Sequence, residues 1–273
     1  MVSNREPPQA QDEIVYIAPE ANLAEIEEFK TVLSADWPDC QEAFMTAPSP
    51  GMLATAMHNR FYNTHDEYLD ALGEAVAIEY RAAINNGLTL QIDAPDLAME
   101  RHLTFADKPL SEFLDFVERV VEQINRAISG LPAEKIRLHV CWGNYEGPHH
   151  LDVPLQDILP RILQTNVSGF MFPFANPRHQ HEIDVLRNIP LKANQYLIAG
   201  VIDTLTNFIE HPEVIAQRIE RAVTVVGDPS KVRAGTDCGF DTAAGMGRVT
   251  ADIVWGKFAA MRQGADIATK RLF

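Results

Sequence analysis

The chain has 273 residues, of which 46% are hydrophobic and 22% charged, proportions that exclude a disordered or collagen-like protein. Its 38 acidic residues against 23 lysines and arginines give a net charge of −15, which argues against binding to a nucleic-acid backbone. The longest apolar runs are far below the roughly 18 residues of a membrane-spanning helix, and the N-terminus lacks the apolar core of a signal peptide. We therefore expect a cytoplasmic protein that binds neither nucleic acid nor membranes.

Short apolar runs recur along the chain after residues 1–12, which we expect to form a flexible N-terminal arm. Residues 13–273 are expected to form a single domain. A run from Ile14 is a weak candidate for a strand, and six clearer runs each end in a polar or Pro/Gly cluster, as buried strands do. The six clear runs begin at Ala43, Leu88, Ile136, Gly169, Tyr196 and Val232.

Amphipathic segments lie between these runs and predict helices. Residues 64–87 begin with Thr64 and acidic residues and stop at Gly87, the pattern of a capped helix. Similar signals predict helices over residues 111–130, 210–227 and 249–272. Helices that alternate with buried strands indicate a parallel α/β sheet.

Such a sheet can be open or closed into a barrel. An open dinucleotide-binding sheet carries a GxGxxG turn after its first strand, and the sequence has no such turn. Polar, chemically capable residues instead follow nearly every run, as in a (β/α)8 barrel, whose active site is built from strand ends on one face. We therefore predict a TIM-type barrel, although six clear runs and one weak run are fewer than eight.

A histidine and two cysteines form the strongest chemical pattern. Side chains at positions i and i+2 of a strand face the same way, so His139 and Cys141 lie side by side at a strand end. Cys238 ends another run, and the strand ends of a barrel meet on one face. Imidazole and thiolates are zinc ligands, so these three residues predict a zinc site, with a structural histidine and two inert cysteines as the alternative. The third cysteine, Cys40, has no polar neighbours and is interpreted as a small buried residue.

Other polar residues at the strand ends are candidates for substrate contacts. A carboxylate at Asp93 can hold a substrate amine or cation, whereas Asp96 can also serve as a helix cap. Two polar loops, residues 142–150 and 176–182, hold several histidines that could bind metal, contact substrate or serve the structure. The residues that we expect to contact substrate are Gln91, Asp93, Asp96, Trp142 and Asn144.

Five motifs in chain order, QIDAPD, HVCWGN, FANPRHQHE, GVIDT and GTDCGF, resemble the cobalamin-independent methionine synthase family over about residues 40–270. The likeness is greatest to its short, single-domain bacterial relatives, a group that includes epoxyalkane:coenzyme M transferase. The resemblance implies a (β/α)8 barrel with zinc at the C-terminal ends of the strands. It assigns the zinc to His139, Cys141 and Cys238, the substrate amino group to Asp93, and a catalytic role to Asp237.

Two features depart from the family pattern. The family's glutamate ligand falls on Pro173 or Phe174, so the fourth metal position is left to water, to substrate, or to Glu146, His149 or His179. The family's first two strand motifs are also missing, which implies a barrel without its first one or two βα units. The chain is then a fragment, or it needs a companion chain or a second copy to complete the barrel, because an open sheet edge invites association.

The function implied by the resemblance is a zinc-dependent methyl or alkyl transferase, similar to 5-methyltetrahydropteroyltriglutamate–homocysteine S-methyltransferase of methionine biosynthesis. Zinc would hold a small homocysteine-like or coenzyme M-like thiol as the thiolate, which attacks an alkyl donor. The main alternative is a catalytically inactive barrel remnant that acts as a partner or regulatory subunit. A zinc-free barrel of the uroporphyrinogen decarboxylase type leaves the His139, Cys141 and Cys238 pattern unexplained.

Overall fold

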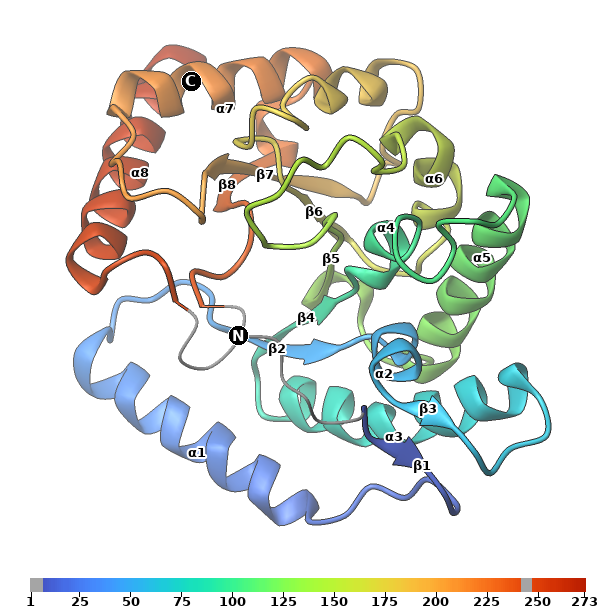
Figure 1. Ribbon diagram of the computed structural model, residues 1–273. Coiled ribbons are helices and arrows are strands. Elements are labelled where there is room, and N and C mark those ends of the chain that lie inside the picture. The colour runs from blue at the N-terminus through green and yellow to red at the C-terminus, as the bar shows by residue number, and fades with distance from the viewer. Residues whose placement is uncertain (1–6, 242–246) are drawn as a thin grey trace.

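Six parallel strands form the central sheet of the computed structural model, which describes residues 7–241 and 247–273 (Figure 1). The sheet order is β2-β4-β5-β6-β7-β8, and every neighbouring pair is parallel. All six clear runs are thereby confirmed as strands, and the predicted parallel α/β sheet is confirmed. The strands are β2 (Phe44–Pro48), β4 (Thr89–Asp93), β5 (Ile136–His139), β6 (Gly169–Phe172), β7 (Tyr196–Ile202) and β8 (Val232–Thr236).

The sheet curls so strongly that its two edge strands approach each other. Strands β5 and β8 are three positions apart, about 14 Å in a flat sheet, yet side-chain atoms of His139 and Cys238, at their ends, lie within 4.8 Å. Near the other end of the strands, Arg233 of β8 forms a 2.8 Å ion pair with Glu42, just before β2. In a flat sheet five strand spacings, about 24 Å, would separate them. The sheet therefore wraps around an interior hollow.

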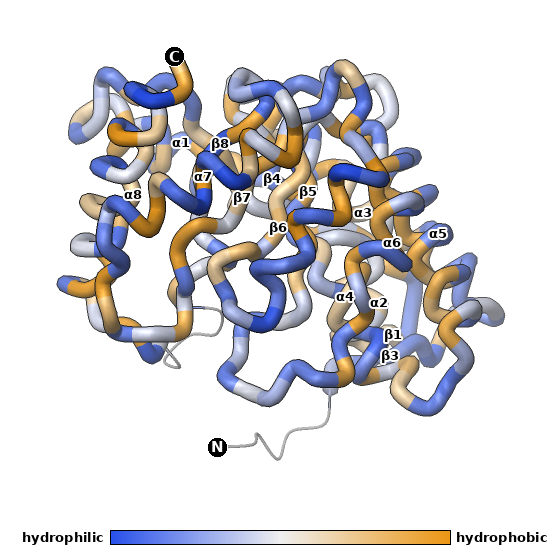
Figure 2. Tube along the Cα trace, turned by 90° about the horizontal axis from the view of Figure 1, so that it is seen from above, coloured by the Kyte–Doolittle hydropathy of each residue, from blue (hydrophilic) through white to orange (hydrophobic). Residues whose placement is uncertain are grey.

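Side chains alternate between this hollow and the surrounding helices. Gln91 and Asp93 of β4 line the hollow, whereas Leu90 and Ile92, which alternate with them, are fully buried in the core against the helices. The same period of two is expected for any strand with two different faces. Figure 2 shows hydrophobic segments along the sheet and its packed helices, with hydrophilic residues prominent in the loops.

Long helices surround the outside of the sheet (Figure 1). The capping box of Thr64 and Glu67 begins α3, and Gly87, with a φ of 84°, ends that segment, as predicted. The four predicted helices are confirmed within a few residues at their ends. They are α3 (His65–Asn85), α5 (Leu110–Ala127), α7 (Pro212–Val226) and α8 (Ala251–Leu272), and the structure adds α2 (Pro50–Ala56), α4 (Asp96–Met99) and α6 (Leu155–Ile162).

The N-terminal part lies outside the central sheet. Strand β1 (Gln9–Ala10) pairs with β3 (His58–Asn59), and α1 (Pro19–Asp36) packs on α3. The weak run from Ile14 is not a strand but irregular chain before α1, so that interpretation was wrong. Residues 1–6 of the expected arm lie outside the described residues.

Two further observations concern the surface. Cys40 is exposed, so its interpretation as a buried residue was wrong. Within residues 7–241 and 247–273, no helix combines the length and the apolar character needed to span a membrane.

Candidate metal centre

His139, Cys141 and Cys238 converge at the C-terminal ends of the strands. His139 is the last residue of β5, and Cys141 follows it by two residues; Cys238 follows the end of β8 by two. A ring nitrogen and the two sulfurs all lie within 4.8 Å of one another, and the three residues are 5 to 8% exposed. The predicted meeting of these side chains is confirmed, and the buried group can bind a metal such as zinc.

The ring of His139 lies between two oxygen acceptors. Its Nδ1 is 2.6 Å from Oδ1 of Asp93, and its Nε2 is 3.0 Å from the carbonyl oxygen of Asp237. Burial lowers the pKa of His139, but the neighbouring Cys141 and Asp93 outweigh burial and raise the pKa to about 9. The surroundings of this ring therefore stabilise a positive charge.

The two thiols interact with each other. The thiol of Cys238 donates a hydrogen bond to the sulfur of Cys141, which lowers the pKa of Cys141 and raises that of Cys238. Cys141 therefore loses its proton more readily than an ordinary thiol. A bound cation can replace the protons that remain on Cys238 and His139. The chemistry of the donors, one imidazole and two buried sulfurs beside a carboxylate, fits zinc.

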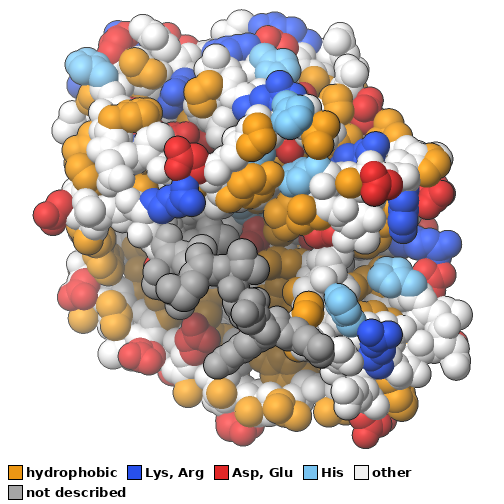
Figure 3. Space-filling view, in the orientation of Figure 1, with side chains coloured by type: hydrophobic (Ala, Val, Ile, Leu, Met, Phe, Trp, Pro, Cys, Tyr) orange, Lys and Arg blue, Asp and Glu red, His pale blue; other side chains and the backbone are white. Residues whose placement is uncertain are grey.

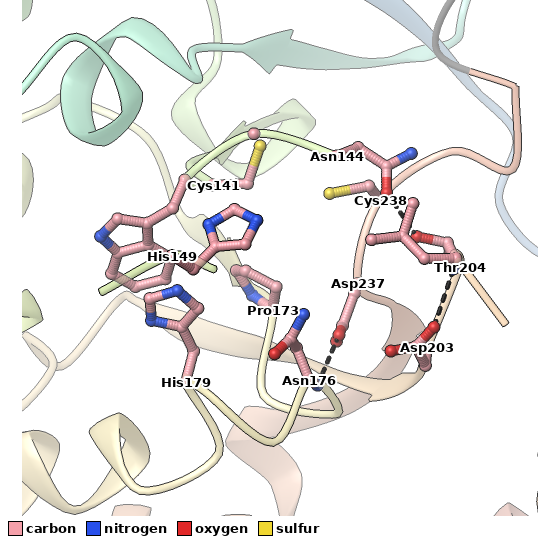
Figure 4. A pocket seen from close by; sticks show the side chains of 13 residues that line it. Cys141, Asn144, His149, Pro173, Asn176, His179, Asp203, Thr204, Asp237 and Cys238 are labelled. Carbon is pink, nitrogen blue, oxygen red and sulfur yellow. Dashed lines mark hydrogen bonds between the residues drawn. The ribbon is translucent and has the colours of Figure 1, made fainter. Parts of the chain in front are cut away.

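The structure also places the candidates for a fourth ligand. Pro173, rather than Phe174, lines the small cavity beside Cys141 and Cys238, so this position offers no metal-binding atom (Figure 4). The carboxylate of Glu146 lies at the surface, 2.6 Å from Arg248, and is 79% exposed, so the structure does not bring it to the group.

His149 and His179 line the same small cavity as the two sulfurs, and Figure 4 shows them close together there. Each ring is 2.8 Å from the carboxylate of Asp152. Neither contributes an atom to the set that lies mutually within 4.8 Å of His139, Cys141 and Cys238.

Asp237 is held by backbone groups. Its two carboxylate oxygens accept hydrogen bonds from the N–H groups of Ala175 and Asn176, at 2.9 and 2.8 Å. Burial raises the pKa of Asp237 to about 7, although these two bonds act in the opposite direction. Asp237 thus ties the loop after β6 to the segment that carries Cys238, and its catalytic role stays a prediction.

A cavity of about 660 Å³ extends from the metal-ligand group into the curled sheet. Figure 3 shows a hollow on this face with hydrophobic side chains in it. Gln91 and Asp93 line it, as does Asn144, which donates a hydrogen bond to the carbonyl of Gly239 at 2.7 Å and accepts one from Thr204 at 3.0 Å. These three residues therefore line one cavity, and their contact with a substrate stays a prediction.

Two other predicted substrate residues lie elsewhere. Asp96 is 1% exposed beneath α2, where it accepts a 2.6 Å hydrogen bond from Ser49, and it does not line the cavity. Trp142 lines the small cavity, but its Nε1 donates to the carbonyl of Val153 at 2.7 Å and its ring stacks on His179.

Three charged or titratable residues near the site were not predicted from the sequence. Arg137 lines the large cavity, stacks on Phe44 and donates to Gln91 at 2.9 Å. The sequence could have indicated Arg137, because it lies two residues before His139 on the same strand and the two side chains therefore share a face. Asp152 and His102 carry no such signal, because their neighbours come from separate loops.

Comparison with known proteins identifies distant homologues. A methionine synthase from Thermoplasma volcanium is 27% identical over 199 residues, which cover 66% of this chain and 54% of that protein. The 2-hydroxypropyl-CoM lyase of Xanthobacter autotrophicus is 28% identical over 153 residues, which cover 46% of this chain and 40% of the lyase. The chain thus spans about half the length, or less, of these curated relatives. No protein-family model matches it.

The fold resembles that of a solved enzyme. The B12-independent methionine synthase from Shewanella sp. W3-18-1, in complex with selenomethionine, matches with a TM-score of 0.66 and 19% identity. The match covers 90% of this chain and 67% of the other, and shows an α/β fold similar to that TIM barrel. The chain is distantly homologous to cobalamin-independent methionine synthases and 2-hydroxypropyl-CoM lyase, which confirms the resemblance found in the motifs.

Proposed function

We propose that the chain is a zinc-dependent transferase that activates a small thiol and joins it to a methyl or alkyl group. One observation carries this proposal: the buried group of His139, Cys141 and Cys238 opens on a cavity of about 660 Å³. The distant homology to a methionine synthase and to 2-hydroxypropyl-CoM lyase supports the proposal, since both relatives are named as enzymes that act on small molecules.

In this function, His139, Cys141 and Cys238 hold the metal. Zinc, when bound there, would supply a positive charge that lowers the pKa of a substrate thiol. Asp93 orients the His139 ring through its 2.6 Å contact. Asp237 holds the loop after β6 beside the group.

The cavity suits a thiol that carries an anionic end. Arg137 and His139 lie two residues apart on β5 and both line the cavity, with their Cα atoms about 7 Å apart. A short molecule could therefore place its sulfur at the metal and its carboxylate or sulfonate near the Arg137 guanidinium. Homocysteine-like and coenzyme M-like thiols both have this form, and Asp93 is the acceptor available for a substrate amino group. The second substrate is a donor of a methyl or alkyl group.

The architecture we propose is a (β/α)8 barrel without its first one or two βα units. Six curled strands and the approach of Arg233 to Glu42 support this interpretation. The outer edges of β2 and β8 have no strand partner among the described residues, so a companion chain or a second copy could pair with them.

A second candidate function is that of an inactive barrel that acts as a partner or regulatory subunit. Pro173 favours it, because this residue lines the site without offering a ligand atom. Alkyl transfer to a thiol by the isolated chain would exclude this candidate.

Metal analysis of the purified chain, with and without a thiol, tests the transferase proposal. We expect Cys141→Ser and Cys238→Ser each to lose one zinc ion relative to the unchanged chain, and Cys40→Ser, a change at an exposed cysteine, to lose none. X-ray absorption at the zinc edge should show one additional sulfur when homocysteine or coenzyme M is added. The same zinc count in both site variants as in the unchanged chain, or an unchanged sulfur count with every thiol tested, would contradict the proposal.

A further inference from the structure

Three histidines surround one carboxylate outside the His139–Cys141–Cys238 group. Oδ2 of Asp152 lies 2.8 Å from Nδ1 of His149 and 2.8 Å from Nε2 of His179, and its Oδ1 lies 2.9 Å from Nδ1 of His102. The four side chains are at most 9% exposed. One ligand atom each from His149, Asp152 and His179 lies within 4.8 Å of the others, the spacing of a metal-ligand set. His102 is not part of this set and contacts the other oxygen of the same carboxylate.

Two of these atoms have no hydrogen-bond partner. Oδ1 of Asp152 and Nδ1 of His102 are close, but they are not aligned as a hydrogen bond, and both are buried without a partner. A buried carboxylate oxygen and a buried ring nitrogen without partners are costly to the fold. A cation between them would satisfy both atoms at once.

The outward-facing nitrogens of the rings support the same conclusion. Nε2 of His149 is 3.0 Å from the carbonyl oxygen of Tyr145, and Nε2 of His102 is 2.9 Å from the Tyr145 hydroxyl. Nδ1 of His179 faces the carboxylate of Glu182 at 3.9 Å, beyond hydrogen-bond distance, and is itself buried without a partner. A histidine that binds metal through one nitrogen usually directs the other to a carbonyl, carboxylate or similar oxygen.

We propose that Asp152, His102, His149 and His179 bind a second divalent metal ion, distinct from the one held by the sulfur-containing group. Three imidazoles and one carboxylate favour zinc or another transition metal over magnesium or calcium, which prefer oxygen ligands alone. The site does not depend on the transferase proposal, since none of its ligands belongs to the first group.

The position of this site gives the second metal a structural task. Its ligands come from the segment after α4, the loop after β5 and the loop after β6. His149 and His179 also line the small cavity beside Cys141 and Cys238 (Figure 4). A metal at Asp152 would therefore join three segments that cover the first site and keep them in place.

Metal counting on the full chain, purified without a histidine tag and loaded with Zn²⁺, tests the proposal. We expect two zinc ions per chain, and one in each of Asp152→Asn and His179→Ala. His150→Ala and His181→Ala change exposed histidines of the same loops, so they should keep two. His149 is left unchanged because its φ of 50° makes substitution there a backbone change as well.

Loading with Co²⁺ distinguishes the two sites. Thiolate-bound cobalt absorbs strongly in the near ultraviolet, whereas cobalt bound to nitrogen and oxygen does not. Asp152→Asn should lose one cobalt and keep this absorption, and the Cys141→Ser, Cys238→Ser double variant should lose the absorption and keep one cobalt. A wild-type chain that binds no second metal, or one that keeps two metals in both Asp152→Asn and His179→Ala, would overturn the proposal; if the variants fail to fold, the wild-type count alone decides.

Discussion

The Nδ1 atom of His139 lies 2.6 Å from the Oδ1 atom of Asp93, and the sheet register pairs these two residues at the ends of neighbouring strands. Parallel pairing of β4 with β5 thus places a carboxylate directly beside a candidate metal ligand. The carboxylate restricts the rotation of the ring and increases its basicity. Asp93 can therefore act on the metal site through His139 and still line the cavity.

This contact predicts the effect of Asp93→Asn. We expect the affinity for zinc to fall about 10- to 100-fold, because the ring loses its charged partner while the three ligand residues remain. Competition with a chromophoric chelator measures the change. Gln91→Ala is the matched control, since Gln91 lines the same cavity and bonds to Arg137 instead of His139. Equal affinity in Asp93→Asn and the wild type would show that the contact has no influence on the metal.

Zinc binding should strengthen as pH rises. His139 has a pKa of about 9 in the metal-free chain, so below this pH a metal must displace a proton from its ring. For each proton that the metal displaces, the affinity for zinc rises by about tenfold per pH unit. Chelator competition between pH 6 and 9 should therefore give a dissociation constant that falls steadily with pH. A constant value over this interval would mean that no ligand is protonated before binding.

The buried carboxyl of Asp96 predicts a pH dependence of folding stability. Burial raises its pKa from 3.8 to about 7, so the folded chain holds this proton more tightly than the unfolded chain. Its contribution to stability is then complete below about pH 4 and is lost as pH rises to about 7, with a slope of at most roughly 1.4 kcal/mol per pH unit. Urea unfolding at several pH values should show a flatter profile for Asp96→Asn. A variant profile parallel to that of the wild type would refute this assignment.

Gly200 of β7 provides the space that Asp237 occupies. A Cβ atom at this glycine would lie 2.2 Å from Oδ1 of Asp237 and 2.9 Å from the carbonyl of Phe172. Gly200→Ala should therefore destabilise the fold by about 1–3 kcal/mol and weaken zinc binding, because Asp237 adjoins Cys238. Gly239→Ala, on the other side of Cys238, meets nothing within 4 Å and serves as the control. Denaturant unfolding and zinc titration measure both effects, and similar behaviour of the two variants would contradict the prediction.

Lys257 of α8 forms a buried ion pair with Glu210, whose carboxylate also accepts the N–H of Asp203. The two side chains are 0 and 2% exposed. Lys257→Met should cost about 3–5 kcal/mol, because it leaves the Glu210 charge buried without its partner.

The matched control for Lys257→Met is Arg262→Met, which breaks an exposed pair with Asp266 on the same helix. We expect its cost to stay below about 1 kcal/mol. Thermal and urea unfolding compare the two variants, and equal losses would argue against a special role of the buried pair.

Local patterns predicted much of the fold. Each of the six clear runs became a strand, since β-branched and other apolar residues followed by polar clusters suit strands covered on both sides. The run from Ile14 failed because a short apolar segment becomes a strand only where a neighbour satisfies its backbone groups. Val15 and Ile17 are 64 and 79% exposed and have no such neighbour.

The sequence by itself determined the strands, the flanking helices and the shared face of His139 and Cys141, because these depend on residues close together in the chain. The tertiary structure confirmed that Cys238 joins them, and it alone showed that Asp96 lies beneath α2 and that Asp152 contacts three histidines. Those relationships depend on how far the sheet curls and how its loops pack, which many distant contacts set together and no short segment encodes.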